Sequence, residues 1–167
     1  MLESKGPALF LQPRIGYGNR TFRICKFRSM RIDRQDLAGS VSTTRDDDRI
    51  TRVGRFIRRT SIDELPQLFH VLAGSMSLVG PRPHAPGSLA GNDLFWDVDH
   101  RYWLRHSLKP GMTGLAQIRG FRGSTHERKD LEDRLRADFE YLENWSLQLD
   151  LRILVATVRV LVHKGAY

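Results

Sequence analysis

The C-terminal stretch WSLQLDLRILVATVRVLVHKGAY, residues 145–167, places the strongest limit on how this chain folds. Drawn as a helix, it is apolar over most of its circumference and keeps one narrow polar sector, formed by Gln148, Arg152, Ala156, Arg159 and His163. Such a helix must either pack deeply into a core or lie half-immersed in a membrane interface. Its β-branched residues leave a strand as the alternative. No apolar run approaches the roughly 18–20 residues of a spanning helix, so we expect no transmembrane segment.

The rest of the chain alternates short apolar patterns with turn-rich segments, which predicts a single, helix-rich α+β domain over residues 1–167. Residues 8–12 and 21–27 flank the turn PRIGYGNR and predict a β-hairpin. Segment 114–118 is predicted to be a strand that forms a small sheet with this hairpin. Residues 31–48 are polar without a sustained period and are expected to be a loop. We expect helices at four further places: residues 49–59, 61–74, part of 92–107, and 125–142.

The chain is strongly basic, with 27 lysines and arginines against 19 acids and a formal charge of +8. Such a surface attracts nucleic acid, phosphorylated substrates or anionic lipid, and the charge alone does not choose among them. The 49–59 helix has arginines on one side and apolar residues on the other, so it and the C-terminal helix are candidates for a membrane surface. The single cysteine, Cys25, cannot form an internal disulfide, which favours a reducing compartment.

Two adjacent acids, Asp63 and Glu64, lie in the most basic stretch, shortly after Arg58. Ser61 and Glu64 have the spacing of a capping box, so one interpretation is that the acids cap the 61–74 helix. The other is that the neighbouring arginines keep the carboxylates ionised, as a nucleophile or a metal ligand requires. Such a site would join a carboxylate nucleophile, Mg²⁺ and guanidinium groups, which are the requirements of phosphoryl transfer.

Other side chains are candidates for the same site. Arg82 lies between two prolines in GPRP, and Lys26 and Arg28 end the second strand; these three are candidate phosphate binders, although charges at strand ends are often only solvated. His84 follows the GPRP loop and is a candidate site residue, whereas His70 is expected to be packed or capped. Metal ligands or a solvated helix cap are the two interpretations of the acidic run Asp46, Asp47 and Asp48.

Five segments follow one another along the chain: FRICKFRSM, DRITRVGRFIRRTSIDELPQL, GSMSLVGPRPHA, LKPGMTGLAQIRGFRG and YLENWSLQLDLRIL. In this order they closely resemble the bacterial sugar transferase family, the monotopic polyprenyl-phosphate hexose-1-phosphate transferases. The resemblance covers the chain from about Gly6 to Tyr167. It implies a helix-rich monotopic catalytic domain with a small sheet and interfacial amphipathic helices. Members ordinarily carry a hydrophobic, membrane-entering helix ahead of this region, which we expect the chain to lack.

The resemblance also implies the reaction, which transfers hexose 1-phosphate from a nucleotide sugar to a polyprenyl phosphate. Asp63 would attack the sugar-linked phosphorus and form an aspartyl-phosphosugar intermediate. Glu64 would bind Mg²⁺, and Arg58 and Arg82 would bind phosphate. The C-terminal half is most similar to the subgroup that uses UDP-glucose and undecaprenyl phosphate to begin exopolysaccharide assembly. The implied location is the cytoplasmic face of the bacterial inner membrane.

Two alternatives to an active transferase remain open. Without a membrane-entering helix, the domain would be an inactive remnant that still binds ligands. The charge of +8 also admits a basic nucleic-acid-binding module, but no recognition helix or sheet of interleaved aromatic and basic residues is evident. The expected partners are therefore a UDP-sugar, a polyprenyl phosphate and a membrane surface, with no specific nucleic acid, and self-association into a homo-oligomer is left open.

Overall fold

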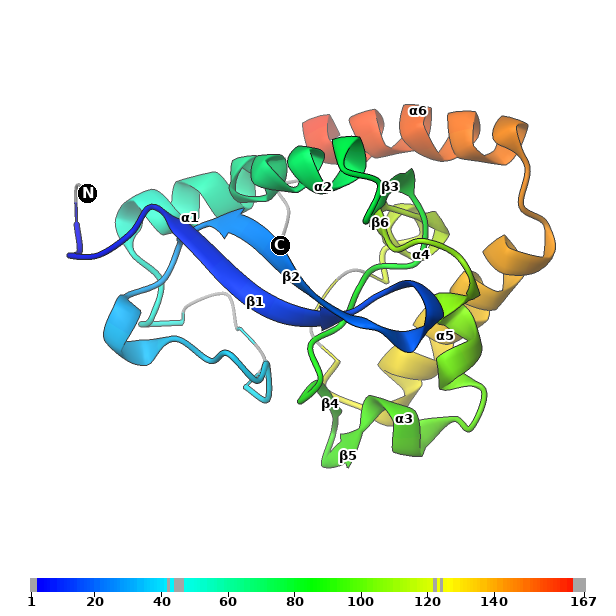
Figure 1. Cartoon of the computed structure of the whole chain (residues 1–167), viewed down its shortest axis with the longest axis horizontal. Coiled ribbons are helices and arrows are strands. Elements are labelled where there is room, and N and C mark those ends of the chain that lie inside the picture. The colour runs from blue at the N-terminus through cyan, green and yellow to red at the C-terminus, as the bar shows by residue number, and fades with distance from the viewer. Residues whose placement is uncertain (1–2, 42, 44–46, 122, 124, 164–167) are drawn as a thin grey trace.

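The computed structural model describes residues 3–41, 43, 47–121, 123 and 125–163, the last four by their backbone alone. Three helices run along one edge of the molecule: α1 (Arg52–Arg59), α2 (Leu68–Leu72) and α6 (Leu147–His163) (Figure 1). A β-hairpin crosses beneath them, and further helices and short strands form the opposite side. The prediction of a mixed, helix-rich chain with little sheet is confirmed.

The predicted hairpin is present and longer than expected. Strands β1 (Leu9–Ile15) and β2 (Thr21–Phe27) pair antiparallel along their whole length, from Leu9 opposite Phe27 to Ile15 opposite Thr21. A single 3-10 turn joins them, in which Gly18 and Asn19 take left-handed φ values of 62° and 60°. Glycine and asparagine adopt this conformation most readily, which explains why the chain reverses here.

The prediction that residues 114–118 form a strand beside the hairpin is wrong. The strand is β6 (Gly111–Thr113), which pairs in parallel with β3 (Ser77–Val79), and the following residues form helix α4 (Leu115–Ile118). Periodicity does not separate strand from helix over so few apolar residues. The β3–β6 pairing also requires close backbone approach, since a Cβ on Gly80 would lie 2.5 Å from the Lys109 carbonyl oxygen. A third two-stranded sheet is formed by β4 (Leu89–Ala90) and β5 (Asp93–Leu94).

Helix α1 begins three residues later than predicted. The Thr51 side chain accepts a hydrogen bond from the Gly54 amide at 2.9 Å and so caps the helix. Gly54 is the only buried residue of α1, and a Cβ there would lie 1.9 Å from the Ser29 carbonyl oxygen. Gly54 therefore lets the helix pack directly against the backbone after β2. Val53 and Phe56, on the apolar side of the helix, are exposed.

The predicted 61–74 helix is present but begins as a 3-10 helix at Ile62–Gln67 and becomes α-helical only in α2. The expected capping box is wrong, because Ser61 has a left-handed φ of 57° and its side chain makes no capping hydrogen bond. Pro66 lies inside the 3-10 segment and has no amide hydrogen to donate to a regular α-helical ladder. A capping box does occur elsewhere, between Glu127 and Asp130 at the start of α5 (Arg128–Glu143).

The core lies between α4, α5, α6 and the short elements beside them. One cluster of buried residues joins β3, α4, α5 and α6, and a second joins α5 to β4, α3 (Phe95–Val98) and a 3-10 helix at Tyr102–Ser107. These helices confirm the predictions for 92–107 and 125–142. Residues 147–163 form a helix, so the strand alternative is wrong. Deep burial of that helix is wrong too, because Ile153 is fully buried while Leu147, Leu151, Val155 and Val158 are 55–70% exposed.

Candidate active site

A cavity of about 810 Å³ is lined by residues of the hairpin, the 3-10 helix at Ile62–Gln67, the loop after β3, and α5. This volume lies within the usual range of small-molecule sites. The lining brings together all six residues that the sequence predicted for catalysis or phosphate binding: Lys26, Arg28, Arg58, Asp63, Glu64 and Arg82. Segments separated by up to about 60 residues therefore meet at one site. The six side chains nevertheless have different bonding partners there.

Glu64 is the centre of a cationic cluster. Its Oε1 accepts a hydrogen bond from Lys26 Nζ at 3.0 Å, and Arg82 donates to both carboxylate oxygens, with NH1 at 3.1 Å from Oε2. Burial alone would raise the pKa of Glu64, but the charges and hydrogen bonds of Arg82 and Lys26 outweigh it and hold the pKa well below its usual range. Burial lowers the pKa of Lys26 to about 8, partly offset by Glu64. Glu64 therefore stays ionised, as predicted.

Asp63 is held in a different way from its neighbour. It is 8% exposed and lines the cavity, and no hydrogen bond to its carboxylate occurs among the described residues. Burial raises its pKa, against the opposing charges of Lys26, Arg58 and Arg82. The expected stabilisation of the ionised form is therefore outweighed at Asp63. A carboxylate with unengaged lone pairs, beside cations that bind another group, is suited to attack an electrophile.

The remaining predicted bases have separate surroundings. Arg58 lines the cavity and acts electrostatically on Asp63. Arg28 donates from NH1 to the Lys5 carbonyl at 2.7 Å and from NH2 to the Ser4 carbonyl at 3.1 Å. These bonds tie Arg28 to the N-terminal segment. Of the two predicted strand-end bases, Lys26 is the one that bonds to Glu64.

A second group of bases, which the sequence did not single out, lies behind the Pro-Arg-Pro loop. Arg105 is fully buried and donates from Nε to Asp138 Oδ2 at 2.9 Å and from NH2 to the Arg82 carbonyl at 2.9 Å. Its NH1 lies 2.8 Å from Nδ1 of the candidate residue His84. This buried ion pair fixes the main chain that carries Arg82. The sequence offered no signal for these contacts, because Asp138 and His84 lie 33 and 21 residues from Arg105 along the chain.

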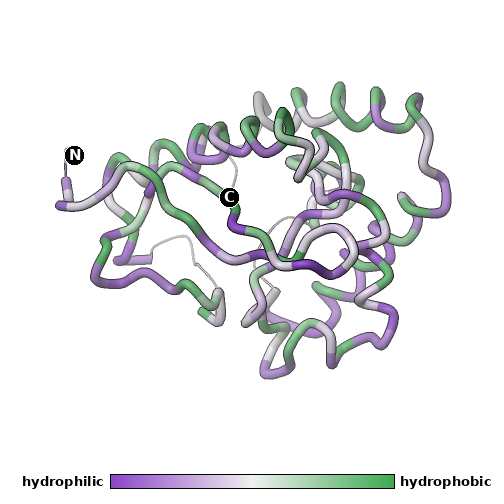
Figure 2. The backbone as a smooth tube through the Cα atoms, in the orientation of Figure 1, coloured by the Kyte–Doolittle hydropathy of each residue, from purple (hydrophilic) through white to green (hydrophobic). Residues whose placement is uncertain are grey.

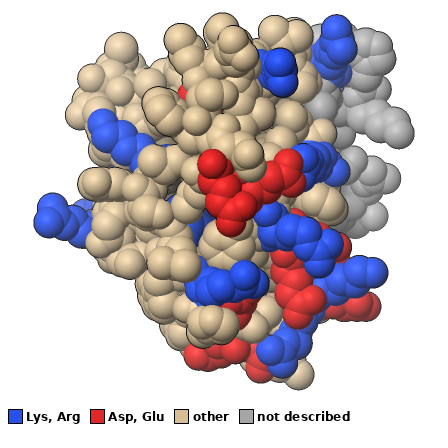
Figure 3. Space-filling view, turned by 90° about the vertical axis from the view of Figure 1, so that its right-hand side faces the viewer, with Lys and Arg blue, Asp and Glu red and all other residues tan. Residues whose placement is uncertain are grey.

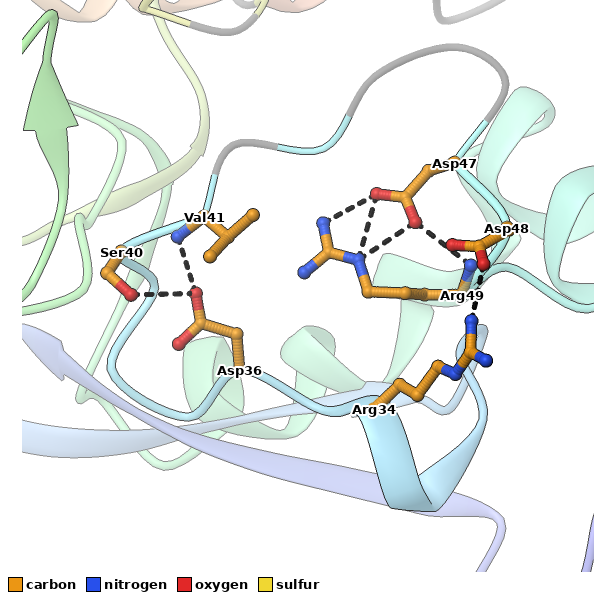
Figure 4. A network of polar contacts seen from close by, with 7 residues as sticks. All are labelled: Arg34, Asp36, Ser40, Val41, Asp47, Asp48 and Arg49. Carbon is orange, nitrogen blue, oxygen red and sulfur yellow. Dashed lines mark hydrogen bonds and ion pairs between the residues drawn. The ribbon is translucent and has the colours of Figure 1, made fainter.

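The two described residues of the acidic run, Asp47 and Asp48, form ion pairs with arginines near the 31–48 loop. Asp47 bonds the Arg49 guanidinium, with Nε at 2.8 Å from Oδ1, and Asp48 pairs with Arg34 (Figure 4). Asp46 lies outside the described residues. Asp36 accepts from the Val41 amide at 2.6 Å and so closes the loop upon itself. Over the described part of the chain, no three His, Cys, Asp or Glu residues form a ready metal site.

His70 is packed, as predicted. Its Nε2 accepts a hydrogen bond from the Cys25 amide at 3.2 Å, and its Nδ1 lies 3.1 Å from Ser75 Oγ. The ring also meets Phe22 edge to face.

The helical segments along the upper edge of Figure 1 carry many exposed large apolar side chains, here together called the apolar edge: Val53, Phe56, Leu65, Leu68, Phe69, Leu72, Leu147, Leu151, Val155 and Val158. Apolar segments recur along these helices in Figure 2. In Figure 3, which views the molecule from its right-hand side, charged residues gather over the lower part and the upper part is mostly uncharged. Of the described helices, none is long and apolar enough to cross a membrane. Sequence periodicity marked the α2 residues as apolar but did not show that they face outwards.

Comparison with known proteins identifies relatives of this chain. It is 53% identical over 158 residues to an undecaprenyl-phosphate glucose phosphotransferase of Komagataeibacter xylinus, covering 95% of this chain and 30% of that protein. It is 49% identical to a UDP-glucose:undecaprenyl-phosphate glucose-1-phosphate transferase of Xanthomonas campestris pv. campestris, with 99% and 34% coverage. Identity to the exopolysaccharide production protein PSS of Rhizobium leguminosarum bv. phaseoli is 48%, with 94% and 78% coverage.

The chain thus spans 30% and 34% of the length of the first two relatives. Residues 1–164 also match the sequence profile described as Bacterial sugar transferase. A profile match over nearly the whole chain agrees with the five motifs and with the clustering of Asp63, Glu64 and Arg82 in one cavity. The chain therefore belongs to the bacterial sugar transferase family.

Proposed function

We propose that this domain transfers glucose 1-phosphate from UDP-glucose to undecaprenyl phosphate, in the first membrane step of exopolysaccharide assembly. One observation carries the proposal: Asp63 presents a carboxylate without hydrogen bonds to the described residues, next to the Lys26–Glu64–Arg82 cluster in a cavity of about 810 Å³. The names of the relatives, which refer to glucose 1-phosphate transfer, undecaprenyl phosphate and exopolysaccharide, support the choice of sugar and lipid.

The proposed reaction has two displacements at one phosphorus atom. An Asp63 oxygen attacks the β-phosphorus of UDP-glucose, and the bond from that phosphorus to the bridging oxygen breaks, so that UMP leaves with the electron pair. An oxygen of undecaprenyl phosphate then attacks the same phosphorus. The bond to Asp63 breaks, the carboxylate is restored, and undecaprenyl diphosphate glucose is formed. In this proposal Lys26 and Arg82 stabilise the negative charge on the phosphoryl oxygens, which their position at Glu64 beside Asp63 supports.

The residues at the site fit a Mg²⁺ ion that is shared with substrate phosphates. Glu64 Oε2 accepts one hydrogen bond, from Arg82, and a carboxylate oxygen has room for a second partner. Mg²⁺ is usually held by one or two carboxylates together with phosphate oxygens, so a cage of three protein ligands is not needed. Glu64 is thus the proposed ligand, and the ion, when bound, neutralises charge on the phosphate oxygens.

The apolar edge is proposed to lie on a membrane surface. Phe69 and Leu72 are 75% and 83% exposed, which is costly in water and favourable among lipid chains. Exposed arginines of α1 lie beside this edge, where anionic lipid head groups would attract them: Arg52, Arg55 and Arg59. A lipid acceptor such as undecaprenyl phosphate would then reach the cavity without leaving the membrane.

We place the domain on the cytoplasmic face of the bacterial inner membrane. The free thiol of Cys25 agrees with a reducing compartment. The apolar edge and the α1 arginines agree with a domain that lies on the membrane without crossing it.

The proposal is tested by trapping the covalent intermediate. The chain is incubated with labelled UDP-glucose and Mg²⁺ without acceptor, and its peptides are mapped by mass spectrometry. We expect glucose phosphate on the peptide that contains Asp63, with release of UMP. Asp63→Asn should abolish both, whereas Asp97→Asn, the same change at an exposed aspartate of α3, should leave both unaltered.

UMP release by Asp63→Asn at the wild-type rate would remove Asp63 as the nucleophile. The sugar is tested separately by replacing UDP-glucose with UDP-galactose or UDP-N-acetylgalactosamine, because relatives at 40% and 44% identity are named for those sugars. Faster labelling by either of these donors would contradict the assignment of glucose while leaving the reaction class in place.

A further inference from the structure

One wall of the cavity, here called the inner wall, is formed by Arg14 of β1, His84 of the loop after β3 and Arg134 of α5. It holds more positive charge than the described carboxylates balance. Arg134 of α5 is 7% exposed and donates to two main-chain carbonyls, from Nε to Phe121 at 2.9 Å and from NH2 to Gly123 at 2.7 Å. Among the described residues no carboxylate forms an ion pair with it. Burial lowers the pKa of Arg134 to about 10, helped by the charge of Arg105. This guanidinium therefore remains charged at neutral pH with neutral hydrogen-bond partners.

Arg14 of β1, on the same wall, is likewise a guanidinium whose hydrogen-bond partners are neutral. Its NH1 donates to the Pro83 carbonyl at 3.1 Å and its NH2 to Gln12 Oε1, while its Nε has no hydrogen-bond partner among the described residues. Burial lowers its pKa to about 10, and the charge of Arg82 adds to the effect. Both Arg14 and Arg134 line the cavity that also contains Asp63.

His84 lies between two guanidinium groups. Its Nδ1 is 2.8 Å from Arg105 NH1 and its Nε2 is 3.3 Å from Arg134 NH1. Burial, followed by the charges of the arginines around it, holds its pKa well below the usual range, so the ring is neutral. A guanidinium only donates, and a neutral imidazole accepts at one nitrogen and donates at the other. Both ring nitrogens therefore face a donor, and the nitrogen that carries the hydrogen lacks an acceptor; the shorter contact favours Nδ1 as the acceptor and Nε2 as the donor.

Arg14 and Arg134 line this wall and form no ion pair with a described carboxylate, whereas Arg105, which is fully buried, pairs with Asp138. Glu64 attracts Arg14 electrostatically, but its carboxylate is bonded to Lys26 and Arg82. Two guanidinium groups without a bonded counter-charge are costly on a largely buried wall unless an anion enters. A phosphate monoester carries close to two negative charges at neutral pH and only accepts hydrogen bonds from donors such as these. Its charge and its acceptor oxygens supply what Arg134 NH1 and His84 Nε2 lack.

We propose that Arg14, His84 and Arg134 form a second anion site, which binds the phosphate of a phosphate monoester and is separate from the Lys26–Arg82 pair at Glu64. The existence of this site does not depend on the proposed function, but the identity of its ligand does. That ligand is either the nucleoside monophosphate that leaves the donor or the head group of the polyprenyl phosphate. Both share the same phosphate chemistry, and His84 directly follows the Pro83 carbonyl that Arg14 binds.

The site is tested by titrating the chain calorimetrically with UMP and with geranyl phosphate, a short polyprenyl phosphate. We expect Arg134→Gln and Arg14→Gln to raise the Kd for at least one probe by about 10-fold or more, as loss of a charged hydrogen-bond partner does. Arg136→Gln is the matched control, because Arg136 lies on the same helix with its side chain 78% exposed. A loss confined to UMP assigns the site to the nucleotide, and a loss confined to geranyl phosphate assigns it to the lipid.

Wild-type affinity for both probes in either folded variant would overturn the role of the residue replaced, and in both variants it would overturn the site. Should a variant not fold, the wild-type chain decides: the guanidinium NMR signals of Arg14 and Arg134 must shift when either probe saturates the protein, and unchanged signals refute the proposal. These readouts need no turnover. An unlabelled Asp63 with intact phosphate binding would refute the proposed function alone, and a labelled Asp63 with unchanged binding in the variants would refute the second site alone.

Discussion

Replacing Asp138 by asparagine tests how far one buried ion pair holds this domain together. Asp138 is 2% exposed and Arg105 is 0% exposed, and two guanidinium nitrogens of Arg105 donate to Asp138 Oδ2, at 2.9 and 2.5 Å. Asparagine keeps the size of the side chain and one acceptor oxygen, but it removes the negative charge. Arg105 is then left as a buried cation beside His84 and Arg134, without its counter-charge.

Removing one partner of a buried ion pair costs about 3–5 kcal/mol of unfolding free energy. In a domain of this size each kcal/mol lowers Tm by about 2–4 °C, so Asp138→Asn should lower Tm by about 6–20 °C. Asp133→Asn, on the same helix, is the matched control. Its carboxylate lies 3.5 Å from the exposed Arg136 guanidinium, and surface pairs are worth about 0–1 kcal/mol.

Thermal unfolding of the three proteins, followed by circular dichroism, measures the difference. A loss for Asp138→Asn no larger than that for Asp133→Asn would refute the importance assigned to the buried charge. The double variant Arg105→Met with Asp138→Leu should recover part of the loss, because apolar residues often replace a buried pair without cost. Recovery should be incomplete, since the Arg82 carbonyl and His84 Nδ1 lose their donor.

Three further changes have clear expected outcomes. Gly54→Ala should cost about 1–3 kcal/mol in urea unfolding, because its Cβ would lie 1.9 Å from the Ser29 carbonyl oxygen. Glu64→Gln should be less stable than wild type above about pH 5, because the folded pKa of Glu64 lies well below the unfolded value of about 4.3. That difference should fade as pH falls through the folded pKa. Phe69→Ser should weaken sedimentation with anionic vesicles, because this ring is 75% exposed on the apolar edge.

Each of these changes has its own control. Gly123→Ala meets no atom within 4 Å of the added Cβ and should leave the urea midpoint near that of wild type. A stability difference between Glu64→Gln and wild type that grows toward low pH would contradict the depressed pKa. Leu37→Ser removes an apolar side chain that is 54% exposed but lies outside the apolar edge, so equal loss of vesicle binding in both variants would argue against a defined membrane face.

The locally encoded elements were predictable from the sequence. The hairpin, α1, α5 and α6 follow from turn residues and apolar periodicity, which reflect hydrogen bonds between residues near in sequence. The same local rules failed where an element is very short or strained. They predicted a strand at 114–118 and a capping box at Ser61, whereas a helix and a left-handed residue occupy those places.

The site was predictable in part, and mainly through the family motifs. Asp63 and Glu64 were candidates from their position among arginines, Arg82 from its rigid loop and Lys26 from its position at the end of a strand, and the motifs gave the first three their roles. The structure adds that Glu64 is bound by Lys26 and Arg82 while Asp63 is not hydrogen-bonded to the described residues. That difference between two adjacent acids depends on which segments pack around them, and adjacency in sequence carries no information about it.

By itself, the sequence determined the hairpin and the longer helices, that the chain is basic, and that Asp63 and Glu64 lie close in sequence to several arginines. The tertiary structure alone decided that Arg14 and Arg134 line one cavity, that Arg105 pairs with Asp138, and that the apolar side of α2 faces outwards. The physical reason is that helix and turn propensities act over a few residues. Burial and pairing of charges depend on contacts between residues 33 to 69 positions apart, which form only when the whole chain has packed.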